Sequence, residues 1–325
     1  MNDIVNPDHK GLSEKPKVLN WKHLQDELLY SDNDYAVEKL RTGLKLETNE
    51  FTTTEPAEKI NYHCYWYGDI GHKQVFSIKS FLCTQDTRKC KLTLWLDAYN
   101  GFENYVDNTC LQEVLGFIEV KAYHPLKEVK NTPWEYYFNV PHDNYNLARR
   151  SDAFRFIILH NYGGLYFDLD VMFLKDLGIL LNSEFCYAWE KQNYANSALL
   201  NLKKKSYISN YILEKSVNNN TVFPWDIFDY SDPLLRGLLV LPSAFFDPIW
   251  QGLKAEEYPF VEFQKFFSPF DHTFTNKFNI LTYKDFYTGC FAYHWHNQWN
   301  VTEYENSFFG IFDKEFSKIL RVINK

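Results

Sequence analysis

Two kinds of apolar spacing follow each other along the chain, one typical of strands and one typical of helices. Strand-like runs cover Lys59 to Gly68, Leu92 to Leu96, Val114 to Val120 and Phe185 to Glu190. Helical spacing covers Lys73 to Phe81, Asn196 to Leu202 and Ile208 to Val217. Alternating strands and helices indicate an α/β protein with a doubly wound, Rossmann-like sheet flanked by helices.

The stretch from Ser151 to Leu174 combines several local signals. A helix is predicted from Asn146 to Asn161, and Asp152 and Arg155 share one of its faces because they are three residues apart. The Gly163–Gly164 pair ends this helix, since glycine readily adopts the positive φ that commonly follows a helix. The sequence therefore places an acid and a base side by side, just before a sharp reversal of the chain.

A strand from Leu165 to Leu174 is predicted next, and it contains Asp168 and Asp170. Alternate side chains of a strand share a face, so both carboxylates are expected to point the same way. Two neighbouring carboxylates repel each other and lose hydration, and a divalent cation would relieve both penalties. Oxygen ligands in small number suit Mg²⁺ or Mn²⁺, with a substrate diphosphate completing the coordination.

Composition narrows the class of protein. The formal net charge of −8 argues against nucleic acid as a partner, because phosphate binding needs a basic surface. No run reaches the roughly 18 to 20 apolar residues that span a bilayer, and the first residues lack the layout of a signal peptide. The six cysteines are scattered and fit reduced thiols, with a Cys83–Cys90 disulfide left open. We expect a cytoplasmic enzyme, bacterial or acting in the host cytoplasm of a virus.

Two parts of the chain differ in composition. Residues 1–58 are polar and contain three prolines, and short amphipathic helices are expected within them. We interpret this part as an N-terminal extension. Residues 59–325 are long enough for a single catalytic domain.

The succession S-D-x-x-R, G-G-x-Y and D-x-D-V, between residues 151 and 171, resembles the DXD-containing glycosyltransferase family 32. Initiating α-mannosyltransferases, α-1,4-galactosyltransferases, capsular polysaccharide transferases and the clostridial glucosylating toxins carry a similar block. The resemblance implies a GT-A-type mixed sheet and a retaining hexosyltransferase of polysaccharide biosynthesis that depends on Mn²⁺ or Mg²⁺. The implied donor is a nucleotide-diphosphate sugar, a UDP-sugar ahead of GDP-mannose, and the implied acceptor is a saccharide or glycan.

The same resemblance implies roles for the residues of the block. Asp170 would bind the metal directly, and Asp168 would bind the metal or the ribose. Asp152 and Arg155 would hold hydroxyls of the donor sugar. Tyr166, two residues before Asp168, would also contact the donor.

In that family the first strand ends in a Trp-aromatic-Gly segment that holds the nucleotide base. The matching residues here are Tyr65, Trp66 and Gly68, and Trp299 belongs to a second aromatic segment that the family uses for the donor. A role for Trp66 in the core fits its pattern equally well. Asp97 follows the second strand at the sheet edge where ligands gather, although a capping or turn role fits it better.

The segment AYHWHNQW, residues 292–299, supplies a further metal ligand if the resemblance holds. The toxins place a metal ligand five residues before a tryptophan, and His294 stands in that relation to Trp299. A neutral imidazole can bind Mn²⁺ beside two carboxylates. His296 and Asn297 are the alternative ligands.

Two other functions compete with glycosyl transfer. A phosphatase of the haloacid-dehalogenase type also has an apolar strand that leads into D-x-D, but Met172 stands where that class requires Thr or Val. A non-catalytic carbohydrate-binding protein would explain the high aromatic content without needing an intact pair of metal-binding acids. Chelator-sensitive use of a nucleotide sugar would separate the transferase from both alternatives.

Overall fold

The computed structural model describes residues 59–137, 146–189, 192–251, 263–269, 282–287 and 290–323. The predicted extension, residues 1–58, lies outside these ranges, together with the helices expected in it. The chain divides into two compact units. Among the described residues, unit 1 comprises 122–137, 146–167, 180–189 and 192–241, and unit 2 comprises the remainder.

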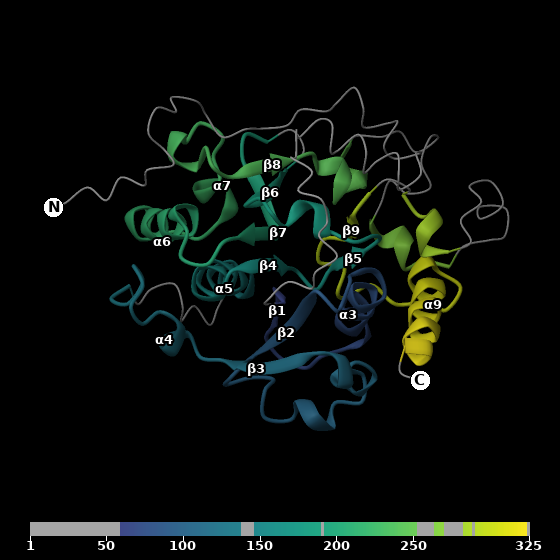
Figure 1. The fold of residues 1–325 in the computed structure, drawn as a ribbon. Helices are drawn as coiled ribbons and strands as arrows, with labels where there is room; N and C mark the ends of the chain where they lie inside the picture. The colour runs from purple at the N-terminus through teal and green to yellow at the C-terminus, as the bar shows by residue number, and fades with distance from the viewer. Residues whose placement is uncertain are drawn as a thin grey trace. The chain divides into compact units, whose positions relative to one another are not determined.

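Unit 1 is built on a mixed sheet covered by helices. Its strands are β4 (Gly164–Phe167), β6 (Phe185–Ala188), β7 (Ala195–Leu202) and β8 (Leu239–Leu241). Strand β7 pairs antiparallel with both β4 and β6, and β6 pairs parallel with β8. Helices in this unit are α4 (Pro125–Glu128), α5 (Leu147–Tyr162), α6 (Tyr207–Asn219) and α7 (Pro224–Ile227). Helix α5 packs on α6 and against β4 and β7 (Figure 1).

Strand β7 corrects the sequence prediction for residues 196–202, which was a helix. Every residue of Ala195–Leu202 is buried, because the strand is paired on both edges and covered on both faces. A short apolar run without alternation does not distinguish a doubly buried strand from a helical segment. Pairing with β4 and β6 makes this segment a strand, and the local sequence does not reveal that pairing.

Helix α5 confirms the helix predicted over residues 146–161 and its glycine end. The Asn146 side chain accepts a hydrogen bond from the backbone N–H of Arg149 at 3.0 Å, which caps the first turn. Gly163 follows the helix with φ +67°, and a Cβ at this position would lie 2.7 Å from the backbone nitrogen of Lys204. Only glycine fits both the backbone angle and this close approach.

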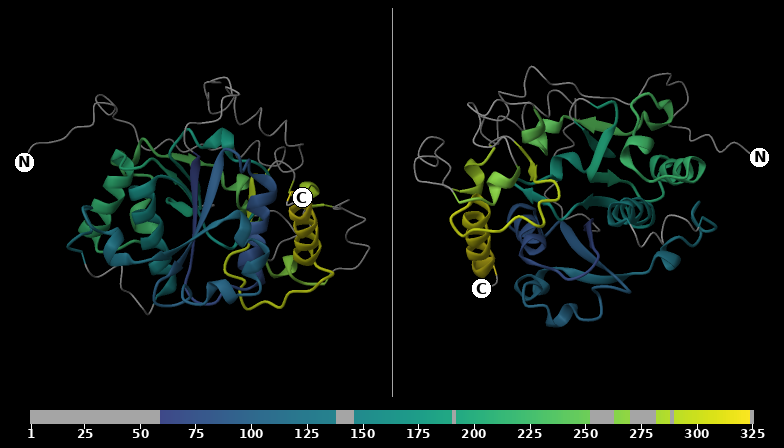
Figure 2. Two further views of the ribbon diagram at one scale, coloured as in Figure 1. Left: turned by 60° about the horizontal axis from the view of Figure 1, so that its bottom comes forward. Right: turned by 180° about the vertical axis from the view of Figure 1, so that it is seen from behind.

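Unit 2 begins with the parallel pair β1 (Ile60–Trp66) and β2 (Cys90–Asp97), joined through helix α3 (His72–Thr84). These elements confirm three predictions at their expected places. Helix α3 also packs against the C-terminal helix α9 (Phe308–Ile323), and the views of Figure 2 show the two side by side. Parallel strands with a crossover helix here, and the mixed sheet of unit 1, confirm the α/β class.

A second, two-stranded sheet in unit 2 pairs β5 (Val171–Phe173) antiparallel with β9 (Ala292–His294). Two serines of α3 hold β5 in place: the Ser77 hydroxyl donates to the carbonyl of Val171 at 2.5 Å, and the Ser80 hydroxyl accepts from the N–H of Phe173 at 2.9 Å. The strand that directly follows the D-x-D motif is therefore fixed to the helix that follows β1.

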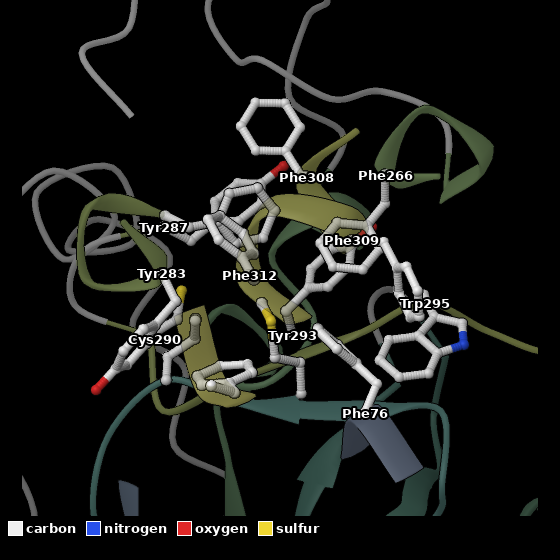
Figure 3. Packing of buried hydrophobic residues seen from close by; sticks show 14 of the residues in the cluster. Phe76, Phe266, Tyr283, Tyr287, Cys290, Tyr293, Trp295, Phe308, Phe309 and Phe312 are labelled. Atoms are coloured by element: carbon white, nitrogen blue, oxygen red, sulfur yellow. The ribbon is translucent and has the colours of Figure 1, made fainter. Parts of the chain in front are cut away.

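Aromatic side chains fill the core of unit 2 beside β9 (Figure 3). Phe76 of α3 is fully buried, and its ring lies 4.5 Å from that of Phe309 and 5.7 Å from that of Trp295, centroid to centroid. Phe266 stacks on Trp295 at 6.0 Å. The cluster includes Tyr293 of β9 and Trp295, the residues on either side of His294.

Two further expectations are settled by the fold. Leu115–Phe117 form a 3-10 turn, and the strand predicted from Val114 to Val120 begins only at Glu119, as β3 (Glu119–Tyr123), which crosses the boundary between the units. Cys83 and Cys90 are not joined by a disulfide. Among the described residues, no helix combines the length and apolar character needed to cross a membrane.

Candidate functional site

The D-x-D motif lies in a turn and not within a strand. Strand β4 ends at Phe167 and β5 starts at Val171, so the single strand predicted from Leu165 to Leu174 is wrong. The backbone N–H of Val171 donates to the carbonyl of Asp168 at 3.1 Å and closes the turn. Asp168 is half-buried and Asp170 is buried. The two carboxylates were expected to point the same way because alternate residues of a strand share a face. The turn also brings them together, since Asp168 and Asp170 belong to one group of possible metal ligands.

His294 reaches this turn through the pairing of β9 with β5. In that register His294 lies opposite Val171, the residue next to Asp170. The His294 Nε2 atom is 3.2 Å from Asp170 Oδ1, and both side chains are almost completely buried. The sequence separated these residues by more than a hundred positions, and the β5–β9 sheet brings them together.

The backbone after His294 turns toward Asp170 as well. His296 and Asn297 have φ of +48° and +56°, a left-handed conformation that histidine and asparagine adopt more readily than most residues. As a result the N–H of Asn297 donates to Asp170 Oδ2 at 2.7 Å. The N–H of Trp295 donates to the carbonyl of Asp170 at 3.0 Å. Asp170 is therefore held by hydrogen bonds to its backbone and to its carboxylate.

Asp170 and His294 form a buried ion pair. Burial alone would raise the pKa of Asp170 and lower the pKa of His294. Their mutual attraction and hydrogen bond outweigh the burial, so the pKa of Asp170 is lowered and the pKa of His294 is raised. Each group of the pair therefore favours the charged form of the other.

Asp247 is the residue of this site that sequence reasoning missed. Its carboxylate Oδ2 lies 2.5 Å from His296 Nε2 and 3.6 Å from His294 Nδ1. A single aspartate before a proline gives no local signal that links it to two histidines farther along the chain. Burial raises the pKa of Asp247, but the attraction of both histidines and the hydrogen bond to His296 lower it overall.

Asp168, Asp170 and His294 fit a divalent cation. Their ligand atoms, two carboxylate oxygens and one imidazole nitrogen, all lie within 4.8 Å of one another. Oxygen ligands suit Mg²⁺ and Mn²⁺, and one nitrogen ligand favours Mn²⁺. His296 joins a second group, with Asp247 and His294, and is not grouped with Asp168 and Asp170.

The aromatic residues expected at the donor site occupy different environments. Trp66 is half-buried, and its ring meets that of Trp299 edge to face at 4.7 Å. Tyr65 is buried and donates its hydroxyl to Asp97 Oδ2 at 3.0 Å. Asp97 also accepts from the N–H of Tyr99, which is the expected turn role. Gly68 has φ +98° and open space where a Cβ would stand.

A polar pocket of about 160 Å³ begins one residue after Gly68. Its lining comes from the loops that follow β1 and β2, at the carboxyl ends of these parallel strands. Close packing shapes the region, because a Cβ on Gly101 would lie 2.7 Å from the carbonyl oxygen of Gly68. The carboxyl ends of parallel strands are where open α/β sheets place their ligands.

Asp152, Arg155 and Tyr166 belong to unit 1 and form a local network there. The Arg155 guanidinium lies 3.2 Å from Asp152 Oδ1 and 4.6 Å from the centre of the Tyr166 ring. It also donates to the hydroxyls of Ser197 at 2.9 Å and Ser151 at 3.0 Å. The predicted proximity of the acid and the base on one helical face is confirmed, and the arginine is held rigidly.

Residues 84–195 match the family model for the glycosyltransferase sugar-binding region containing a DXD motif. No curated protein matches the chain at a significant level. Among solved structures, the PaToxG glycosyltransferase is 16% identical over 64% of this chain and 77% of its own, with a TM-score of 0.43.

Two further solved structures are similar to the chain. The galactosyltransferase LgtC, in complex with donor and acceptor sugar analogs, is 13% identical over 81% of this chain and 96% of its own, with a TM-score of 0.41. GlyE of Streptococcus pneumoniae is 14% identical over 81% of this chain and 62% of its own, with a TM-score of 0.40. With TM-scores below 0.5, these structures do not support a function for the chain. The similarity to glycosyltransferases therefore rests on the family match. Residues 84–195 therefore resemble the DXD-bearing sugar-binding region of glycosyltransferases.

Proposed function

We propose that the protein is a metal-dependent, retaining glycosyltransferase that moves a hexose from a nucleotide-diphosphate sugar to a saccharide or glycan acceptor. A UDP-sugar is the favoured donor, with GDP-mannose as the second. The observation that carries the proposal is the grouping of Asp168, Asp170 and His294 within the motif that the family match covers and the strand paired with it.

Each of the three residues of this group would supply a ligand to the cation. Asp168 and Asp170 supply carboxylate oxygens, and His294 supplies Nε2 once that nitrogen has lost its proton. When bound, a divalent cation neutralises the charge that develops on the diphosphate leaving group. The N–H of Asn297 fixes one oxygen of Asp170, so the carboxylate is oriented before any ligand arrives.

We assign the nucleotide base to the region of Trp66, Trp299 and Gly68. Both tryptophans are half-buried, and the face of an indole ring is a stacking surface that tolerates either a uracil or a guanine. Gly68 leaves room for close approach of the donor to the backbone. The buried Tyr65 would stabilise the end of β1 through its hydrogen bond to Asp97. The polar pocket that begins after Gly68 would contact the ribose or the base.

Asp152, Arg155 and Tyr166 are assigned to the hydroxyls of the donor sugar. Support comes from their rigidity, since ordered polar groups can orient a sugar with little loss of entropy. Retention of configuration rests on the resemblance of the S-D-x-x-R and D-x-D blocks to a retaining family. Because the sequence and the site do not single out a covalent nucleophile, a front-side, oxocarbenium-like route is the working mechanism.

A panel of nucleotide sugars tests this function. The thermal midpoint of the protein is measured with UDP- and GDP-sugars, with and without Mn²⁺, and donor hydrolysis is followed in parallel. Ligand binding raises the midpoint by mass action, and we expect the rise to require both the sugar nucleotide and Mn²⁺. Asp170→Asn should abolish it, whereas Asp313→Asn, which removes a carboxylate that pairs with Lys79 on the α3–α9 side of unit 2, should not.

Other outcomes would point to the competing functions. Phosphate release from an aryl phosphate without use of any nucleotide sugar would favour a phosphatase. Saccharide binding that chelator leaves unchanged, together with no donor hydrolysis, would favour a carbohydrate-binding protein. Either result would remove the transferase proposal.

A further inference from the structure

Asp247 lies in a turn that the backbone attaches to β9. It follows the short 3-10 segment Ser243–Phe245, and its N–H donates to the carbonyl of Ser243 at 2.7 Å. The carbonyl of Phe245 accepts from the N–H of Phe291, also at 2.7 Å. These bonds hold the carboxylate beside His294 and His296, and its side chain is only 4% exposed.

Two imidazoles face the same oxygen of Asp247. His296 Nε2 makes the short contact of 2.5 Å, and His294 Nδ1 makes a longer electrostatic contact of 3.6 Å with Oδ2. The two rings are stacked, with centroids 3.7 Å apart and planes 27° apart. Imidazole lone pairs lie in the ring plane, so rings stacked in this way do not readily aim two lone pairs at one ion about 2.0–2.1 Å away. The arrangement suits a carboxylate that accepts N–H groups better than it suits a second metal site.

Of the two carboxylate oxygens of Asp247, Oδ2 contacts the histidines. The other, Oδ1, is buried and has no hydrogen-bond partner in the described part of the chain. A buried carboxylate with an unsatisfied oxygen is unfavourable, and it is retained only where its remaining contacts compensate. The compensating contacts here are the two histidines.

The opposite nitrogen of His294 faces the candidate cation site. Nε2 lies 3.2 Å from Asp170 Oδ1, while Nδ1 faces Asp247. A carboxylate that faces Nδ1 favours a proton on that nitrogen, so that Nε2 is the nitrogen that gives up its proton and offers its lone pair when a cation binds. Histidines that bind metals are commonly oriented by a carboxylate in this way.

We infer that Asp247 is a positioning residue, which holds the His294 ring so that its Nε2 completes the cation site formed with Asp168 and Asp170. This inference rests on the proposed function, because it requires a cation at that site. His296 does not bind the cation in this arrangement. It contacts the same oxygen of Asp247, Oδ2, and the Phe263 ring lies 4.6 Å from its own.

Mn²⁺ binding, followed by the loss of the free-ion electron paramagnetic resonance signal, tests the inference without any substrate. Asp247→Asn keeps the shape of the side chain and removes its charge. We expect it to raise the Mn²⁺ dissociation constant about 10- to 100-fold. The control is Asp313→Asn, which removes a carboxylate charge elsewhere in unit 2 and should bind Mn²⁺ like the wild type.

A double-mutant cycle shows whether Asp247 acts through His294. In a His294→Gln background, adding Asp247→Asn should change Mn²⁺ affinity by no more than about twofold, since the ring it positions is gone. Wild-type affinity in Asp247→Asn, or an equal loss in both backgrounds, would overturn the inference and leave the proposed function standing. Failure of the wild type itself to bind Mn²⁺ would instead refute the metal site, and the inference with it.

Should Asp247→Asn not fold, the wild type provides the decisive measurement. Nitrogen-15 spectra of the histidine side chains, recorded with Mg²⁺ and assigned with His294→Gln, report which ring nitrogen carries the proton. The inference requires a protonated Nδ1 and an unprotonated Nε2 on His294. The opposite tautomer would overturn it.

Discussion

Lys73 ties the loop after His294 to helix α3, and its replacement by methionine should loosen that loop. The ammonium is almost completely buried, and it donates to three backbone carbonyls, of Gln298 at 2.5 Å, Trp299 at 3.2 Å and Val301 at 2.6 Å. It also lies 4.2 Å from the centre of the Phe267 ring. Methionine keeps the length of the side chain and removes all three bonds.

The magnitude follows from two opposing effects. Hydrogen bonds that involve a charged group contribute about 1.5–3 kcal/mol each, so three of them give a large gross stabilisation. Burying an ammonium costs several kcal/mol, and burial indeed lowers the pKa of Lys73, with Glu303 acting in the opposite direction. The net loss of local stability in Lys73→Met should therefore be about 2 kcal/mol, which corresponds to roughly 30-fold faster opening of the loop.

Hydrogen exchange followed by mass spectrometry measures this directly. Peptides that cover residues 296–303 should exchange roughly 30-fold faster in Lys73→Met, and donor affinity should fall because Trp299 is no longer held against Trp66. Lys79→Met is the matched control: Lys79 is equally buried on the same helix, but it pairs with Glu113 and Asp313. It should leave exchange of this loop unchanged. Equal exchange in Lys73→Met and the wild type would refute the reasoning.

Three further predictions concern unit 2. Phe76→Ala should lower the free energy of unfolding by about 3–5 kcal/mol in urea titrations, because it empties the centre of the aromatic cluster. Gly101→Ala should weaken donor binding without changing Mn²⁺ affinity, since its Cβ would displace the carbonyl of Gly68; equal donor affinity in calorimetry would contradict this. Burial lowers the pKa of Lys175 from 10.5 to about 8, so at this group the unfolded chain binds more protons between these values, and Lys175 contributes stability that rises with pH there by up to about 3 kcal/mol. In urea titrations across that pH range, the free energy of unfolding of the wild type minus that of Lys175→Met should rise by this amount, and a constant difference would contradict the prediction.

The D-x-D block and its imidazole partner could be predicted because their signals are local. Asp168 and Asp170 are two residues apart, and the His294–Trp299 spacing falls within one short segment. Their convergence, at 3.2 Å between His294 and Asp170, is what the structure adds. The continuous strand in which they were expected is interrupted at the same two carboxylates, because the Val171 N–H bonds to the Asp168 carbonyl and closes a turn.

The features that sequence reasoning missed depend on contacts between distant segments. Asp247 is recognisable only after Phe291 has paired with the turn that carries it. Residues 195–202 become a strand because partners lie on both edges, and not because their own composition favours one. The bond from the Tyr65 hydroxyl to Asp97 likewise depends on the pairing of β1 with β2, which places the ends of the two strands side by side.

The hydrogen bond from Asn297 to Asp170 joins positions 127 residues apart, and that span has a consequence for the order of folding. Contacts of such long range form late, because the chain must lose much of its entropy before they can contribute. A chain in which β5 and α3 are formed but β9 is not would possess both acids and still lack the nitrogen and the amide that complete their surroundings. If the proposed site binds Mn²⁺, the gain of Mn²⁺ affinity during refolding would report the pairing of β9 with β5, and not the formation of the helices of unit 2.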